Sequence, residues 1–130
     1  MEGKRIQGLA VEDTAQLFAR TRSGVLASID LSWSLNKELE SYIDIYGSNG
    51  TINVGWKASK YRPLSSPNWI VFGKGYDKLQ AFRRQVENFC RAVRGQEQLL
   101  IRPEDALASV QVIEAAYKST RRDDWVPVGA

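Results

Sequence analysis

The sequence contains no histidine and only one cysteine, Cys90, in 130 residues. A single cysteine excludes a disulfide within the chain, and a free thiol is typical of a reducing compartment, so we expect a cytoplasmic protein. A nucleophilic cysteine usually needs a neighbouring base, and there is no histidine to serve as one. We therefore interpret Cys90 as a small buried side chain on a helix.

Long apolar runs and clusters of like charge are missing too. No run approaches the roughly 20 apolar residues that cross a bilayer, and the N-terminal segment has no apolar core of the kind that a signal peptide carries. The 18 lysines and arginines are interleaved with 15 acidic residues, which leaves a net charge of +3. Nucleic-acid binders usually concentrate their basic residues. We expect neither a membrane nor a nucleic acid as a partner.

Candidates for chemistry are few. The stretch Gly73–Lys78 has lysine where a dinucleotide fingerprint needs its third glycine, so we interpret it as a turn from strand to helix. Acidic residues are spread mostly singly, which gives a metal little to bind. Asp30 or Asp44 could act as a general acid or base, or could simply pair with a cation. Lys57 and Lys60, in an aromatic-rich stretch, could meet a polar ligand or be the ordinary lysines of an edge strand.

Residues 14 to about 72 have the pattern of strands. Apolar and polar residues alternate through 14–22, 25–34 and 39–46. Ser23-Gly24 and residues 47–50 supply tight turns between these runs. Shorter strands are expected at 51–54, 56–62 and 69–72. Together these runs predict an antiparallel meander.

Residues 76 to 122 predict two helices. Apolar residues recur in the first at steps of three and four, as Leu79, Phe82, Val86, Phe89 and Val93. Gly95 lies where this helix can end, and Pro103 suits the first position of the second helix. The apolar stripe of the second helix comprises Ala106, Leu107, Val110, Ile113 and Tyr117. Residues 125–128 could return as a short edge strand.

Strands followed by helices predict a single α+β domain over residues 1–130, with a largely antiparallel, open-faced sheet and two main helices packed on one face. We expect the open face to be an interface, with the candidate residues Phe18, Arg20, Leu26, Asp30, Tyr42 and Tyr46. Aromatic residues mixed with arginine and small polar residues are typical of protein interfaces. The alternative is a half-exposed sheet surface on which the aromatics serve β propensity and cross-strand pairing.

Several stretches, taken in order, resemble one protein family. Glu12–Ala15 opens a strand, a hairpin at Gly24 follows, and the next strand ends in Ser32-Trp33. The hairpin Ile45–Ile52 comes next, and the helix Pro103–Ser119 comes last. This order is similar to that of the C-terminal domain of the Gfo/Idh/MocA oxidoreductases, which include glucose–fructose oxidoreductase and inositol dehydrogenase. The resemblance covers about residues 9–128.

The resemblance implies that cofactor binding and the substrate-side sheet lie in different domains of the enzyme. Family members join a Rossmann half, which binds NAD(P), to a C-terminal α/β half whose open sheet helps form the substrate pocket and packs face to face in oligomers. The family's catalytic lysine lies in a Glu-Lys-Pro motif, and an Asp…His pair lies on a later helix. This sequence contains neither, so no catalytic, cofactor-binding or metal-binding residue carries over. NAD or NADP would belong to the Rossmann domain of a parent chain.

Two hypotheses follow. The first is a truncated domain, the substrate-side and oligomerisation part of an NAD(P)-dependent oxidoreductase that acts on sugars or polyols and has no activity alone. The second is a free-standing, non-enzymatic interaction module. Both predict a homo-oligomer that forms through the open sheet face.

Overall fold

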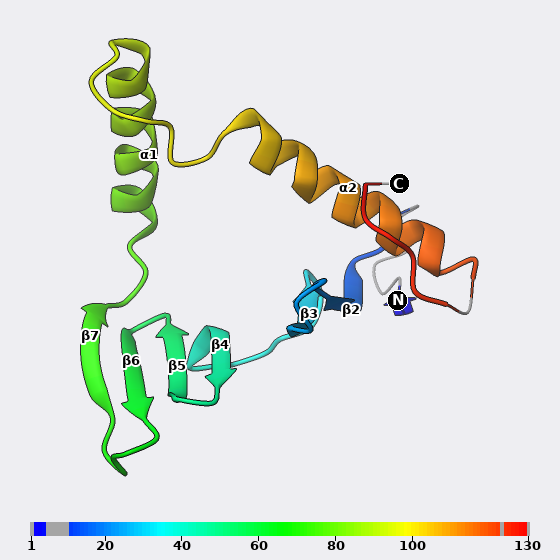
Figure 1. Ribbon diagram of the computed structural model, residues 1–130, viewed down its shortest axis with the longest axis horizontal. Helices are drawn as coiled ribbons and strands as arrows, with labels where there is room; N and C mark the ends of the chain where they lie inside the picture. Colours follow the sequence, from blue (N-terminus) through cyan, green and yellow to red (C-terminus); the bar gives the residue numbers. More distant parts are fainter. Residues whose placement is uncertain (1, 5–10, 123, 130) are drawn as a thin grey trace. The chain divides into compact units, whose positions relative to one another are not determined.

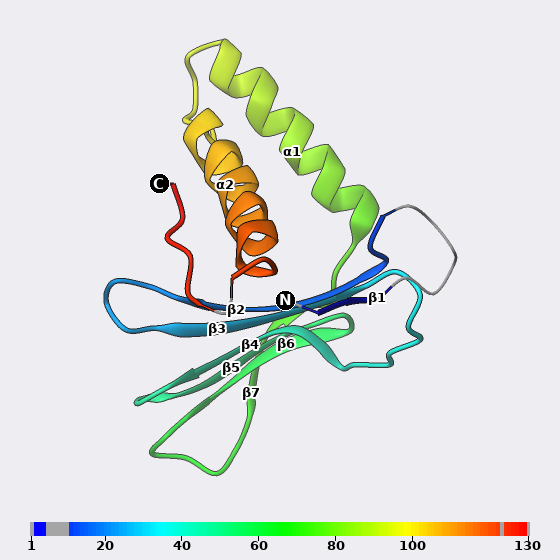
Figure 2. The same cartoon turned by 90° about the vertical axis from the view of Figure 1, so that its right-hand side faces the viewer.

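The computed structural model describes residues 2–4, 11–122 and 124–129. Its strands are β1 (Glu2–Lys4), β2 (Thr14–Arg20), β3 (Leu26–Ser32), β4 (Ser41–Gly47), β5 (Gly50–Gly55), β6 (Ala58–Pro63) and β7 (Ile70–Lys74) (Figures 1 and 2). Two helices follow, α1 (Lys78–Val93) and α2 (Pro103–Ser119). All pairings between these strands are antiparallel, so the predicted α+β class with antiparallel strands is confirmed.

The chain divides into two compact units. Unit 1 comprises residues 1–36 and 101–130, and unit 2 comprises residues 37–100. Unit 1 holds a sheet of order β1-β2-β3 together with α2, and unit 2 holds a sheet of order β4-β5-β6-β7 together with α1. The strands therefore form two sheets, a division that the alternation of apolar and polar residues did not predict.

In unit 1, β2 and β3 pair along their whole length, from Thr14 opposite Ser32 to Arg20 opposite Leu26 (Figure 2). The turn between them contains Gly24 with φ of 91°, a left-handed conformation that glycine adopts without steric cost. The sequence pattern had not predicted β1, which pairs with β2.

In unit 2, four strands lie side by side in chain order (Figure 1). The predicted hairpin turn is confirmed, since Gly47 pairs with Gly50 across it. Gly50 has φ of 150°, and a Cβ there would run into the carbonyl oxygen of Arg62 on β6. Only glycine allows this close approach of strands. The register of β4 shifts between Ser41 and Ile43, which marks a bulge at Tyr42.

The ends of α1 are set by local chemistry. The Asp77 carboxylate accepts a 3.0 Å hydrogen bond from the backbone N–H of Gln80, which caps the helix. Gly95, with φ of 70°, follows the last turn as expected. The segment Gly73–Lys78 is the predicted turn from strand to helix, because β7 ends at Lys74 and pairs antiparallel with β6.

The ends of α2 also follow the expected rules. Pro103 occupies the first turn, where its missing N–H costs nothing. The Asp105 carboxylate accepts a 2.9 Å hydrogen bond from the backbone N–H of Arg102. Residues 125–128 form no strand, so the edge strand expected there is wrong.

The helices bury little of their apolar stripes. All five stripe residues of α1 are exposed, Leu79 to 81% of its surface. Figures 1 and 2 show why: α1 continues beyond the end of β7 and does not lie back over the sheet of its unit. The stripe of α2 is also exposed, and its buried side carries Ala115, the one buried apolar residue among those that the structure describes. Cys90 is exposed on α1, so its predicted burial is wrong.

Candidate interface and ligand cavity

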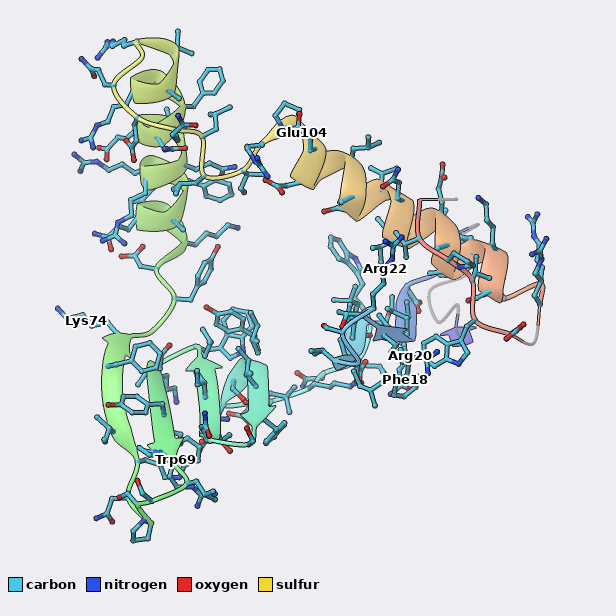
Figure 3. All side chains as sticks on the ribbon, viewed as in Figure 1. Phe18, Arg20, Arg22, Trp69, Lys74 and Glu104 are labelled. Atoms are coloured by element: carbon cyan, nitrogen blue, oxygen red, sulfur yellow. The ribbon has the colours of Figure 1, made fainter. Side chains whose placement is uncertain are left out.

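The open face of unit 1 brings four of the six predicted interface residues together. Residues directly opposite in an antiparallel pair share a face of the sheet. Phe18 lies opposite Ser28, Arg20 opposite Leu26, and Gln16 opposite Asp30, so Phe18, Arg20, Leu26 and Asp30 line one face. Phe18 is 67% exposed and Leu26 72% exposed. Figure 3 labels Phe18 and Arg20 on this sheet.

Arg20 also has a contact within its own unit. Its guanidinium carbon lies 5.4 Å from the ring centroid of Trp125, in the range of a cation–π interaction. This contact holds part of the C-terminal segment next to β2. Arg20 is thus placed by an aromatic ring, whereas Phe18 and Leu26 remain available to a partner.

Tyr42 and Tyr46 lie on β4 in unit 2, in a different sheet from the other four predicted interface residues. Tyr46 is 78% exposed and pairs opposite Thr51. Tyr42 lies at the bulge, which interrupts the alternation that was used to place it. Its ring packs against Trp56, with centroids 4.7 Å apart. Tyr46 thus remains a surface residue, and Tyr42 belongs to an aromatic cluster.

The total accessible surface of the chain is large for its mass. The accessible area is 11397 Å². Two separate compact units that share the mass of this chain would expose about 8,300 Å² in all. The chain thus exposes roughly 3,000 Å² more than two compact units of this mass would. The exposed apolar residues of the two units are therefore more than the scattered ones that any protein surface carries.

Unit 2 contains a second candidate site, built around the backbone of Trp56. The N–H of Trp56 donates a 3.1 Å hydrogen bond to the carbonyl of Glu40, and its own carbonyl accepts a 3.0 Å bond from the N–H of Tyr76. Three segments that are distant in sequence are thereby joined at one residue. We call this point the Trp56 junction.

Two glycines make the junction possible. A Cβ on Gly75 would run into the carbonyl oxygen of Trp56, and a Cβ on Gly55 would run into that of Ala58 and lie 2.9 Å from that of Glu40. Distances this short are not tolerated between a Cβ and a backbone atom. The junction therefore depends on glycine at both positions.

Three aromatic rings gather at the junction. The rings of Trp56 and Tyr76 have centroids 5.9 Å apart at 80°, and those of Tyr42 and Tyr76 are 6.2 Å apart at 68°. Near-perpendicular pairs at these distances are favourable arrangements of aromatic quadrupoles. The sequence pattern missed this cluster because its members come from three separate segments. The aromatic-rich stretch around Lys57 and Lys60 was the only signal that pointed to it.

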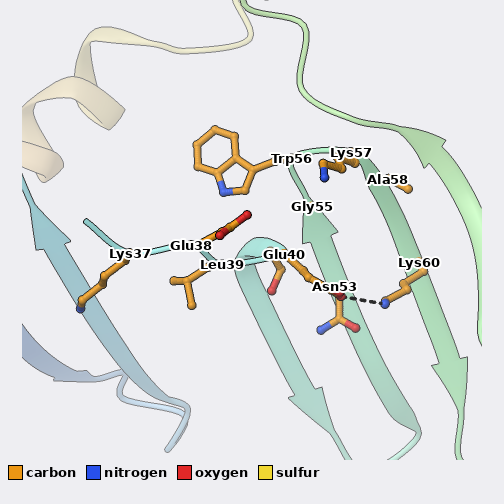
Figure 4. A pocket seen from close by; sticks show the side chains of 11 residues that line it. Lys37, Glu38, Leu39, Glu40, Asn53, Gly55, Trp56, Lys57, Ala58 and Lys60 are labelled. Carbon is orange, nitrogen blue, oxygen red and sulfur yellow. Dashed lines mark hydrogen bonds and ion pairs between the residues drawn. The ribbon is translucent and has the colours of Figure 1, made fainter. Parts of the chain in front are cut away.

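A cavity of about 780 Å³ opens beside the junction (Figure 4). It is lined by Lys37, Glu38, Leu39, Glu40, Ser41, Asn53, Gly55, Trp56, Lys57, Ala58 and Lys60. The Nζ atom of Lys60 lies 3.5 Å from the Glu40 carboxylate, and it also lies 5.2 Å from the ring centroid of Trp69. Charged, amide and aromatic groups thus face one space, which suits a small polar molecule.

Asp30 and Asp44, the two acids considered for general acid or base work, lie in different units. Asp30 is on the open face of unit 1. The Asp44 carboxylate accepts hydrogen bonds from the Ser41 hydroxyl and the Asn53 amide. These bonds give Asp44 a structural role in β4 and β5. The structure therefore gives these two carboxylates no shared site within one unit.

Neither a metal site nor a membrane span is found among the residues that the structure describes. Among the described residues, no three acidic or cysteine side chains are grouped so that they could hold a metal ion. Neither helix of the described chain is both long and apolar enough to cross a bilayer. None of the protein families, characterised proteins or solved structures compared with the chain matches it.

Proposed function

We propose that the chain is the substrate-side and oligomerisation domain of an NAD(P)-dependent oxidoreductase that acts on sugars or polyols. The exposed apolar surface of both units is the observation that supports the first part of this proposal, that the chain works only with partners. Apolar area on this scale is costly in water and is usually buried against another protein surface. The oxidoreductase class rests on the resemblance of the motif order to the Gfo/Idh/MocA C-terminal domain.

Two partners follow from this proposal. A second copy of the chain would pack against the open face that carries Phe18 and Leu26. A Rossmann domain of the parent enzyme would supply NAD or NADP and the catalytic groups. The lone free cysteine fits a reducing, cytoplasmic setting for such an enzyme.

Light scattering on the purified chain tests the oligomerisation part. We expect the wild type to be a dimer or larger at high concentration. Phe18→Lys places an unpaired charge in the centre of the face and should weaken association by about tenfold or more. Leu64→Lys is the matched control, because Leu64 is 80% exposed in the turn after β6 and belongs to the other unit. A wild type that stays monomeric would rule out self-association.

The oxidoreductase part needs separate measurements. The isolated chain is expected to bind neither NADH nor NADPH in a calorimetric titration. Micromolar binding would contradict the proposal that the cofactor belongs to a separate Rossmann domain. The coding sequence on either side of the chain provides the second measurement. A glycine-rich Rossmann half in the same reading frame would support the proposal. Its absence would favour the second candidate, a free-standing module that associates through the same exposed face.

A further inference from the structure

The cavity beside the Trp56 junction has the groups that one class of ligand requires. Trp56 lines it and is 51% exposed. The Glu38 carboxylate points toward the indole ring of Trp56 in Figure 4. An aromatic face attracts cations through its quadrupole, and indole does so most strongly among the side chains. A carboxylate next to such a face adds a charge-assisted hydrogen bond to any ammonium group that also carries N–H.

We propose that this cavity binds a small organic cation whose ammonium group lies between the indole of Trp56 and the carboxylate of Glu38. The site is independent of the proposed oxidoreductase activity, since every residue in it belongs to unit 2. It would bind its ligand whether or not a Rossmann domain is present.

The charges around the cavity favour a cation at this position. Among the described residues, Glu38 makes no hydrogen bond or ion pair, so its charge is not neutralised. Lys60 is held by Glu40 and by the ring of Trp69. In Figure 4 the Lys37 ammonium points away from Trp56, and that of Lys57 lies on the other side of the Trp56 backbone from the indole.

The site is also well fixed before any ligand arrives. The backbone of Trp56 is hydrogen-bonded on both sides, to Glu40 and to Tyr76. The rings of Tyr42 and Tyr76 pack against the indole and restrict its rotation. A side chain that is already ordered loses little conformational entropy on binding, so more of the cation–π attraction remains as affinity.

A pair of probes with the same shape tests the proposal on the full chain. Choline carries a quaternary ammonium group, and 3,3-dimethylbutan-1-ol replaces it with a neutral tert-butyl group. We expect choline to bind in the millimolar range and the neutral alcohol to bind about fivefold more weakly, which corresponds to about 1 kcal/mol for a cation–π contact at a half-exposed ring. Equal affinities would overturn the proposal, and so would a failure of choline to bind.

Variants locate the site. Trp56→Leu should weaken choline binding by about tenfold, Trp56→Phe by less, and Glu38→Gln by about threefold. Trp125→Leu is the matched control, because Trp125 belongs to unit 1, does not line the cavity and already has the Arg20 guanidinium over its ring, and it should leave the affinity unchanged. Circular dichroism checks that each variant is folded. If Trp56→Leu does not fold, Glu38→Gln and Trp56→Phe still decide, and unchanged affinity in both would contradict the assignment.

Discussion

The hydroxyl of Tyr117 donates a 2.8 Å hydrogen bond to the carboxylate of Glu12, across 105 positions of the sequence. Tyr117 is near the end of α2, and Glu12 lies just before β2, so the bond joins the helix of unit 1 to the start of its central strand. It is a long-range side-chain contact in a unit in which Ala115 is the buried apolar residue among those described. We therefore expect this hydrogen bond to help fix the orientation of α2 in unit 1.

Tyr117→Phe tests this dependence. The variant keeps the ring and removes the hydroxyl, and we expect the free energy of unfolding to fall by about 1 kcal/mol, the usual net value for a hydrogen bond, because the exposure of this pair weakens the added effect of the charge. Urea denaturation measures the difference. Tyr46→Phe is the control, because the hydroxyl of Tyr46 is on an exposed side chain without a hydrogen-bond partner in the described structure, and it should have no effect. Equal effects in both variants would mean that the bond contributes nothing.

The fold was predictable where the information is local. The β2–β3 hairpin follows from the alternation along its two strands and the Ser23-Gly24 turn, which together place Phe18 and Leu26 on one face. The helix ends follow from single residues: Gly95 supplies a left-handed conformation, and Pro103 suits a first turn. Each of these features is decided within a few positions of the chain.

The remaining features depend on contacts between distant segments. The side of α2 that is buried contains Ala115, and the long side chains of the predicted stripe are exposed. An apolar stripe predicts which side of a helix can pack against another element. It does not predict that such an element is present in the same unit. The bulge at Tyr42 likewise depends on the pairing with β5 and breaks the alternation locally. The Trp56 junction depends both on contacts between distant segments and on the local break in alternation at Tyr42. Sequence patterns therefore did not predict it.

Asn88 should be the most sensitive polar residue of unit 2. It is buried on α1, donates a 2.9 Å hydrogen bond to the carbonyl of Gln98, and accepts a 3.0 Å bond from the N–H of Leu100. Asn88→Ala removes both bonds and leaves two backbone groups without partners, so we expect a loss of about 2 kcal/mol. Chemical denaturation measures this loss. Gln85→Ala on the exposed side of α1 is the control and should change stability by less than about 0.5 kcal/mol.

Asp77→Ala tests the start of α1. The substitution removes the cap on the N–H of Gln80 and should cost about 1 kcal/mol. Asp77→Asn keeps an oxygen acceptor and should retain most of that stability. Hydrogen exchange of the amides in the first turn of α1 provides the measurement. Protection that is the same in Asp77→Ala as in the wild type would show that the cap does not stabilise this helix.

Gly75→Ala tests whether the Trp56 junction is the structural basis of the cavity. A Cβ at this position meets the backbone of Trp56 and Lys57, which cannot move aside as a flexible side chain can, so the junction must open. We expect destabilisation of about 2 kcal/mol or more, because overpacking against backbone is at least as costly as overpacking in a core. Choline binding should be lost with it, since the indole of Trp56 would no longer be held against Tyr42 and Tyr76.

The matched control for this substitution lies two residues earlier, at Gly73 in β7. A Cβ at Gly73 would approach the Cβ of Ser59 to only 3.4 Å, an ordinary packing contact that a small shift relieves. Gly73→Ala should therefore keep both stability and choline affinity near those of the wild type. If Gly75→Ala binds choline as well as Gly73→Ala does, the rigid junction is not what prepares the cavity. In that case the affinity of the site would have to come from Trp56 and Glu38 alone.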